Sequence, residues 1–175
     1  HSSAFVNWGS KSNKVRIYGL QFEGYNVSGY DGVISAQTNT LSDKFNAAAD
    51  PLYGFNPSND WVVECCTFKR WTCQTPLNVG SAIKCGSGMV IRANTFLDGE
   101  GLGISCIGKD VTIEGNRFER IQMQTPFDSN LCGAMKLFAH KNTKITNNYF
   151  KDIGCKAVWL AFNPENNYVA HNEAY

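Results

Sequence analysis

The chain has 175 residues, of which 43% are hydrophobic and 18% charged, so it carries enough apolar material for one ordered domain with a buried core. Its formal net charge is only +1. Proteins that bind the phosphate backbone of nucleic acids usually carry a clear excess of Lys and Arg, so no nucleic-acid partner is expected. No run of about 18 apolar residues occurs, so no membrane span is expected. No secretory signal is visible after His1.

One eight-residue pattern recurs along the chain, and a repeat of this kind is typical of a solenoid. Each copy ends in an aromatic residue. In chain order the copies are VRIYGLQF from Val15, WVVECCTF from Trp61, MVIRANTF from Met89, VTIEGNRF from Val111, TKITNNYF from Thr143 and YVAHNEAY from Tyr168. The apolar positions alternate with mostly polar ones over the first four residues, which predicts a strand with one buried face.

A corner is expected at the sixth residue of each copy. Three consecutive copies hold Asn94, Asn116 and Asn148 there, and the last copy holds Glu173. Asn tolerates the left-handed backbone conformation that a sharp corner needs. Its amide can also hydrogen-bond the equivalent Asn of the next copy, which predicts an asparagine ladder. The closing aromatic residues would then stack inside the coil.

A second strand is expected after each of the four middle copies. These strands are AIKC from Ala82, GISC from Gly103, AMKL from Ala134 and AVWL from Ala157. The period of two predicts an outward row of one residue per strand, made of Lys84, Ser105, Lys136 and Trp159. Because the neighbouring outward residues are small, this row should form a flat strip. Counting one further, irregular coil before Trp61, we expect six or seven rungs.

Outward-facing charges support the same stacking. Two places after the closing aromatic residue, the copies carry charges of alternating sign: Arg70, Asp98, Arg120 and Asp152. Glu64, Arg92 and Glu114 alternate in the same way within the first strand. Neighbouring rungs lie about 4.8 Å apart, so residues of one row can form ion pairs that help to set the register.

The chain has seven cysteines and no CxxC pair, so a local metal-ligand motif is absent. We expect buried, reduced thiols that act as small hydrophobic residues. Cys85 and Cys106 should stack inward, at a rung spacing slightly longer than a disulfide prefers, while Cys132 and Cys155 align well enough to bridge. We expect no metal or other cofactor. A Ca²⁺ ion remains possible, although no motif in the sequence indicates it.

These repeats resemble the pectin-lyase-like superfamily over nearly all of the chain. The resemblance implies an all-β fold, a right-handed single-stranded parallel β-helix of about six to seven rungs with an asparagine ladder at one corner. Because neither end carries a polar cap, we expect residues 1–175 to be one β-helix segment of a longer chain. The alternative is a chain whose uncapped ends meet a stacking partner, and a homotrimer would fit the viral members of the superfamily.

The resemblance places a ligand cleft on the sheet that carries the outward row. Lys84 and Lys136 would lie two rungs apart, about 10 Å, which suits alternate carboxylates of an acidic polysaccharide. Lyases of this superfamily neutralise the uronate carboxylate and remove a neighbouring proton, so Lys84 and Lys136 are the expected catalytic residues. His140, close after the AMKL strand, is a third candidate base.

Aromatic and hydroxyl side chains near this row suggest sugar contacts. Ser105 and Trp159 belong to the row itself, and Trp71 and Tyr30 lie on neighbouring loops. An aromatic ring offers an apolar face for a pyranose ring. We therefore expect Ser105, Trp159, Trp71 and Tyr30 to bind substrate.

Two functional hypotheses follow, and the sequence leaves both open. The first is a carbohydrate-acting β-helix that binds an acidic polysaccharide and cleaves it by β-elimination or epimerises it. The second is a non-catalytic structural or receptor-binding β-helix of a virion, similar to a phage tailspike, or of a cell surface. Both imply an extracellular, cell-surface or virion-surface location.

Overall fold

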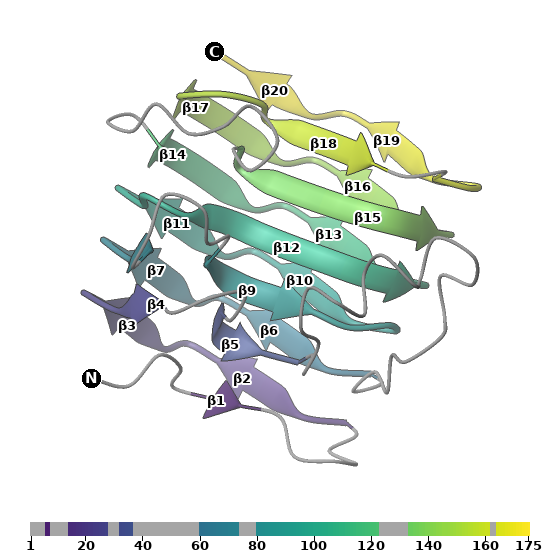
Figure 1. Ribbon diagram of the computed structural model, residues 1–175. Helices are drawn as coiled ribbons and strands as arrows, with labels where there is room; N and C mark the ends of the chain where they lie inside the picture. The colour runs from purple at the N-terminus through teal and green to yellow at the C-terminus, as the bar shows by residue number, and fades with distance from the viewer. Residues whose placement is uncertain are drawn as a thin grey trace.

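The computed structural model describes residues 6–7, 14–27, 32–36, 60–73, 80–122, 133–161 and 164–175. Within these ranges the chain winds into a coil whose successive turns stack, so that long sheets run along one axis (Figure 1). None of these residues forms a helix that is long and apolar enough to cross a membrane.

Three six-stranded sheets form the walls of the coil. Sheet A contains β1 (Val6–Asn7), β5 (Gly32–Ser35), β9 (Ser81–Cys85), β12 (Leu102–Lys109), β15 (Met135–Lys141) and β18 (Val158–Ala161). Sheet B contains β2 (Arg16–Tyr18), β6 (Val62–Glu64), β10 (Val90–Arg92), β13 (Thr112–Glu114), β16 (Lys144–Thr146) and β19 (Tyr168–Ala170). Sheet C contains β3 (Gln21–Glu23), β7 (Thr67–Lys69), β11 (Thr95–Leu97), β14 (Arg117–Ile121), β17 (Tyr149–Ile153) and β20 (Glu173–Ala174). A short pair, β4 (Asn26–Val27) and β8 (Thr72–Cys73), extends one corner.

The strand pairing confirms the predicted parallel β-helix. In sheet B, Ile91 pairs with Val63 on one side and Ile113 on the other, and all three are buried. In sheet A, Ile104 pairs with Ile83 and Met135. The predicted inward rows are therefore stacked in register, and the described residues supply six rungs.

The asparagine ladder is present at the corner between sheets B and C. The Asn94 Nδ2 donates to Asn116 Oδ1 at 3.0 Å, and the Asn116 Nδ2 donates to Asn148 Oδ1 at 3.0 Å. Each Oδ1 also accepts the backbone N–H of the Asn one rung below. One detail of the prediction is wrong: the left-handed residue is the one before each Asn, such as Ala93 with a φ of 52°.

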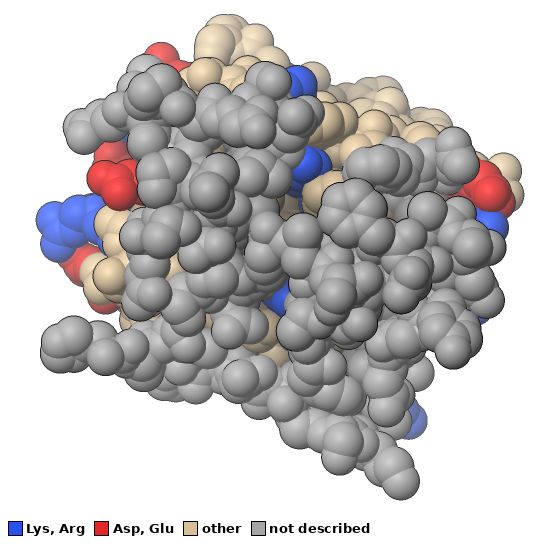
Figure 2. All heavy atoms as spheres, in the orientation of Figure 1, with Lys and Arg blue, Asp and Glu red and all other residues tan. Residues whose placement is uncertain are grey.

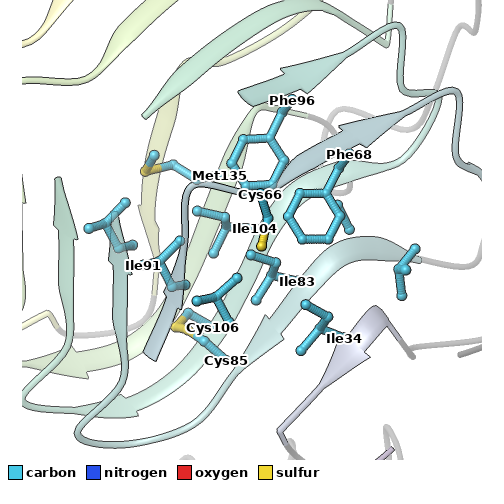
Figure 3. Close-up of a cluster of buried hydrophobic side chains, with 14 of the residues drawn as sticks. Ile34, Cys66, Phe68, Ile83, Cys85, Ile91, Phe96, Ile104, Cys106 and Met135 are labelled. Atoms are coloured by element: carbon cyan, nitrogen blue, oxygen red, sulfur yellow. A yellow bond between two sulfur atoms is a disulfide. The ribbon is translucent and has the colours of Figure 1, made fainter. Parts of the chain in front are cut away.

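The expected aromatic stack fills the interior beside this ladder. Successive rings lie 4.5 to 5.1 Å apart between centroids, and their planes differ by 2° to 16°. Figure 3 shows two of them, Phe68 and Phe96, pointing into the coil beside the apolar residues of sheet A. The full stack is Phe22, Phe68, Phe96, Phe118 and Phe150.

The register of the last copy differs from the predicted one by one residue. Phe150 pairs with Ala174, not with Tyr175, and Ile145 pairs with Val169. The next residue of the ladder is therefore Asn172 and not Glu173. The Oδ1 of Asn172 accepts a hydrogen bond from the Asn148 Nδ2 at 2.9 Å. The prediction anchored the copy on an aromatic residue, whereas hydrogen bonding of the amide decides the register.

The charged rows form the expected ion pairs between rungs. Glu64 accepts from Arg92 at 2.7 Å and from Arg16 at 2.5 Å. The hydrogen bond from Arg92 is the main cause that lowers the pKa of the Glu64 carboxyl. Arg120 likewise pairs with Asp98 at 2.6 Å and lowers the pKa of that carboxyl. The arginines of these pairs are exposed, although Glu64 itself is buried, so each pair contributes about 0.2–1 kcal/mol and mainly favours the observed register.

The left-handed corner generates a stability prediction. Ala93 is exposed and strained at its positive φ, whereas Gly115 occupies the same corner position one rung along, with a φ of 62°. We expect Ala93→Gly to raise the free energy of unfolding by about 0.5–1 kcal/mol in urea titrations, because glycine removes the steric cost. Ala134→Gly, at a buried position without positive φ, should instead lower it by about 1 kcal/mol. Equal effects of the two substitutions would contradict this assignment of strain.

Candidate functional site

The predicted outward row exists on sheet A. Ser105 of β12 pairs with Lys84 of β9 and with Lys136 of β15, and Lys136 pairs with Trp159 of β18. Ser35 of β5 continues the row beyond Lys84. Strands in one sheet lie about 4.8 Å apart, so the two lysines are about 10 Å from each other. We refer to these five residues as the outer row.

The outer row is not the open, flat strip that the sequence predicts. Lys84 is 2% exposed and Lys136 is 3% exposed, and Ser35 is fully buried. Figure 2 has the orientation of Figure 1, in which sheet A lies toward the viewer, and blue Lys and Arg atoms are visible near the centre of this face as well as at its left edge. Burial of a cation is costly unless other groups compensate for its lost hydration. The buried lysines therefore need local partners.

Two aromatic rings provide such contacts for Lys136. Its Nζ lies 3.9 Å from the centre of the Trp159 ring and 4.4 Å from the centre of the Phe138 ring. The Nζ of Lys156 lies 4.2 Å from the Trp159 ring. An ammonium group over an aromatic face is attracted by the ring quadrupole, by up to about 2 kcal/mol when it is desolvated. We call Lys136, Phe138, Lys156 and Trp159 the Lys136 cluster.

Hydroxyl groups separate the two buried lysines of the outer row. The Ser105 Oγ lies between Lys84 and Lys136 along the row and is 3.2 Å from the Ser81 Oγ. A serine hydroxyl both donates and accepts, as a sugar hydroxyl does. The expected site residues Lys84, Ser105, Lys136 and Trp159 are thus brought together on one face of sheet A.

His140 lies apart from the outer row. Its side chain is fully buried, and its Nδ1 is 2.6 Å from the Thr143 Oγ1. Burial lowers the pKa of His140 to about 4, against an opposing effect of the Cys106 backbone, so the imidazole is neutral at neutral pH. A nitrogen of its ring lies within 4.8 Å of the sulfur atoms of Cys85 and Cys106. The expectation of a base at the cleft edge therefore does not match this placement.

Of the two expected loop aromatics, only Trp71 is described. Trp71 is 1% exposed, its Nε1 donates to the Leu102 carbonyl at 3.1 Å, and its ring packs edge-on against Phe96. A ring in this position has no face left for a sugar, so we leave Trp71 out of the site. Tyr30 lies outside the described residues.

Cys85 and Cys106 correct the expectation of reduced thiols. They form a disulfide between β9 and β12, with their Cα atoms 4.7 Å apart, and Figure 3 shows the two residues inside the coil. This Cα separation is close to the rung spacing of about 4.8 Å and lies within the usual Cα range for disulfides, because in-register pairing places the two residues opposite each other. The expectation was wrong because it compared the rung spacing with the shorter preferred Cβ separation. Cys65 and Cys66 are free thiols. Cys132, expected to align with Cys155, lies outside the described residues.

Sequence reasoning missed two members of the Lys136 cluster and one group of buried ligand atoms. Phe138 stands two residues after Lys136, so the period of two could have placed it on the same face. Lys156 precedes its strand, and no periodic signal marks it. The three side chains of Cys85, Cys106 and His140 come from three separate rungs, and their possible ligand atoms all lie within 4.8 Å of one another.

The family model described as the right-handed beta helix region matches residues 5–174. The chain belongs to this right-handed β-helix family. The match confirms the fold and fits the resemblance to the pectin-lyase-like superfamily. Searches of the curated proteins and of the solved structures gave no match. A right-handed β-helix is consistent with carbohydrate-related and with structural proteins of this fold, and the fold alone does not decide between them.

The disulfide of this β-helix leads to a second stability prediction. The bridge closes a sequence separation of 21 residues, for which loop-closure entropy suggests about 3 kcal/mol of stabilisation. We expect the Cys85→Ala/Cys106→Ala variant to unfold at lower urea concentration than the wild-type protein. Reductant should destabilise the wild-type protein at least as much, because it also reduces the disulfide of Cys155. Cys65→Ala, at an exposed free thiol, is the matched control and should change little. A reductant without effect on the wild-type protein would show that the bridge is not formed.

Proposed function

We propose that this β-helix binds an acidic polysaccharide at the Lys136 cluster, where the side chains of Lys156 and Trp159 are only half buried, and not along the buried part of the outer row. The observation that carries the proposal is the pair of ammonium groups, from Lys136 and Lys156, over the single indole of Trp159. Two cations so close together attract a carboxylate or sulfate. Because the aromatic rings already order the lysine side chains, less entropy is lost when the anion binds.

The outer row continues from this subsite toward Ser105, whose side chain is half buried and offers a hydroxyl to a neighbouring sugar. Lys84 stands beyond Ser105, about 10 Å from Lys136, and is 2% exposed, so it is not part of the proposed binding surface. Trp159 acts as a positioning residue for the ammonium groups and supplies apolar surface at the end of the row.

Turnover by β-elimination or epimerisation would begin with removal of the proton beside the uronate carboxylate. Lys136 and Lys156 lie against the same indole, so one of them would neutralise the carboxylate and the other would act as the base. A lysine serves as base only in its neutral form, which burial and a second nearby ammonium group both favour. Lys136 and Lys156 are thus the proposed catalytic pair, while Lys84, about 10 Å away, and His140 have no part in it.

A second candidate function is a structural or receptor-binding β-helix without turnover. The burial of Lys84 and Lys136 favours it, because a lysine held against aromatic rings also stabilises a sheet without any ligand. The disulfide between Cys85 and Cys106 fits an oxidising environment, so we place both candidates outside the cytosol, at a cell or virion surface.

Binding of defined polysaccharides distinguishes the two candidates. We expect alginate, pectate or chondroitin sulfate to bind in calorimetric titrations, more weakly as salt increases, and neutral dextran not to bind. Lys136→Met/Lys156→Met should weaken binding at least about tenfold, since two charge-assisted contacts are lost. The control Lys144→Met removes an exposed lysine from sheet B and should leave affinity within about twofold. Equal binding by the double variant would overturn the proposed subsite.

Absorbance of the unsaturated uronate formed by β-elimination then tests turnover. A rising signal with wild-type protein, lost in Lys136→Met, would support a lyase. A flat signal with binding retained would leave a non-catalytic polysaccharide-binding protein. If no acidic polysaccharide binds at all, the structural candidate remains.

A further inference from the structure

Three side chains from separate rungs converge inside the coil, well away from the outer row. Cys85 comes from β9, Cys106 from β12 and His140 from β15, and all three are buried to 1% exposure or less. Their sulfur and nitrogen atoms lie within 4.8 Å of one another. The two cysteines form the disulfide described above, and the imidazole lies next to it.

The imidazole carries a polar atom that the fold leaves without a partner. The Nε2 of His140 is buried and has no partner in good hydrogen-bond geometry, although the Cys106 backbone lies near enough to raise the pKa of the ring against the effect of burial. On the other side of the ring, Nδ1 lies 2.6 Å from the Thr143 Oγ1, which in turn lies 3.5 Å from the Lys141 carbonyl. If the Thr143 hydroxyl donates to that carbonyl, it accepts from Nδ1–H, and Nε2 then carries a lone pair that a ligand can use.

This arrangement matches the way in which proteins prepare histidine ligands. Metal-binding histidines usually donate their second ring N–H to a neighbouring acceptor, which selects the tautomer and orients the ring. An unsatisfied buried nitrogen costs about 1–3 kcal/mol. A purely structural histidine gains nothing from such a position, whereas a ligand to an ion between the two sulfur atoms would satisfy the nitrogen.

We propose that Cys85, Cys106 and His140 form a buried, redox-dependent site for a soft metal ion, Cu⁺. In the oxidised protein the two sulfur atoms form the disulfide and hold no ion. A dithiol reductant breaks the S–S bond by transferring two electrons and two protons, and becomes a cyclic disulfide itself. Binding of Cu⁺ then releases the two thiol protons, and both thiolates and Nε2 coordinate the ion.

The choice of ion follows from the ligands and their surroundings. Thiolate ligands select soft ions such as Cu⁺ and Zn²⁺. Zinc is almost always four-coordinate and takes a water where the protein supplies three ligands. Only these three side chains meet as a group of possible ligands in the described part of the chain, and they are shut off from solvent. Three ligands in a dry, apolar pocket therefore favour Cu⁺. This inference does not depend on the proposed polysaccharide function.

Refolding with metal tests the proposal on the full chain. The protein is unfolded, refolded with a dithiol reductant and either Cu⁺ or Zn²⁺, and dialysed without oxygen. We expect one retained copper per chain by elemental analysis, with thiolate-to-copper absorbance, and no retained copper in oxidised protein. Copper retained by the oxidised protein, or none in reduced and folded protein, would overturn the site. Retention of zinc but not copper would overturn the choice of ion.

Variants connect the bound ion to these particular residues. Cys65→Ala removes an exposed free thiol and should retain the copper, whereas Cys85→Ala should lose it. Thr143→Val removes the partner of Nδ1 but no ligand, and should weaken copper affinity about 10–100-fold in competition with a Cu⁺ chelator. Far-ultraviolet circular dichroism confirms that each variant is folded. Unchanged affinity in Thr143→Val together with retained copper in Cys85→Ala would contradict the proposal.

Discussion

The amide-to-amide hydrogen bonds between rungs set the register on which every other feature of this protein depends. The Oδ1 of Asn116, Asn148 and Asn172 each accepts from both the side chain and the backbone N–H of the Asn in the preceding rung. The Nδ2 of each ladder Asn also donates to a backbone carbonyl. The groups are buried, so a slip of one residue would leave several of them unsatisfied, at about 1–3 kcal/mol each. Such a slip would also turn every apolar side chain of a strand outward.

This register explains why unrelated chemistry occurs on the two faces of sheet A. On the outside, it aligns Lys84, Ser105 and Lys136 although they are far apart in the sequence. On the inside, it brings Cys85 and Cys106 to a Cα separation of 4.7 Å. In a solenoid, the residues at one position of the repeat stack into a row along the coil. A substitution at that position in one rung therefore lies between the equivalent residues of the two adjacent rungs.

Much of this architecture could be predicted because its signals are local and periodic. The alternation of apolar residues and the recurring Asn and Phe predicted the coil, the ladder and the aromatic stack. The last rung shows where prediction from the repeat fails. Tyr175 has the aromatic side chain that ends the other copies, but Ala174 is the residue that pairs with Phe150. The site was predicted only in outline. Periodicity gave the row of lysines but not their burial, because the period of two assigns a face of the sheet and not what covers it. It also missed Lys156, which precedes its strand.

Coupling between neighbouring ladder residues tests the central claim most directly. A double-mutant cycle of Asn116→Ala and Asn148→Ala, measured by urea unfolding, compares the double variant with the two single variants. Because the two amides are bonded to each other, we predict a coupling free energy of about 1 kcal/mol or more. Effects that add within about 0.5 kcal/mol would show that the two residues are not in contact, and would contradict the stacked register.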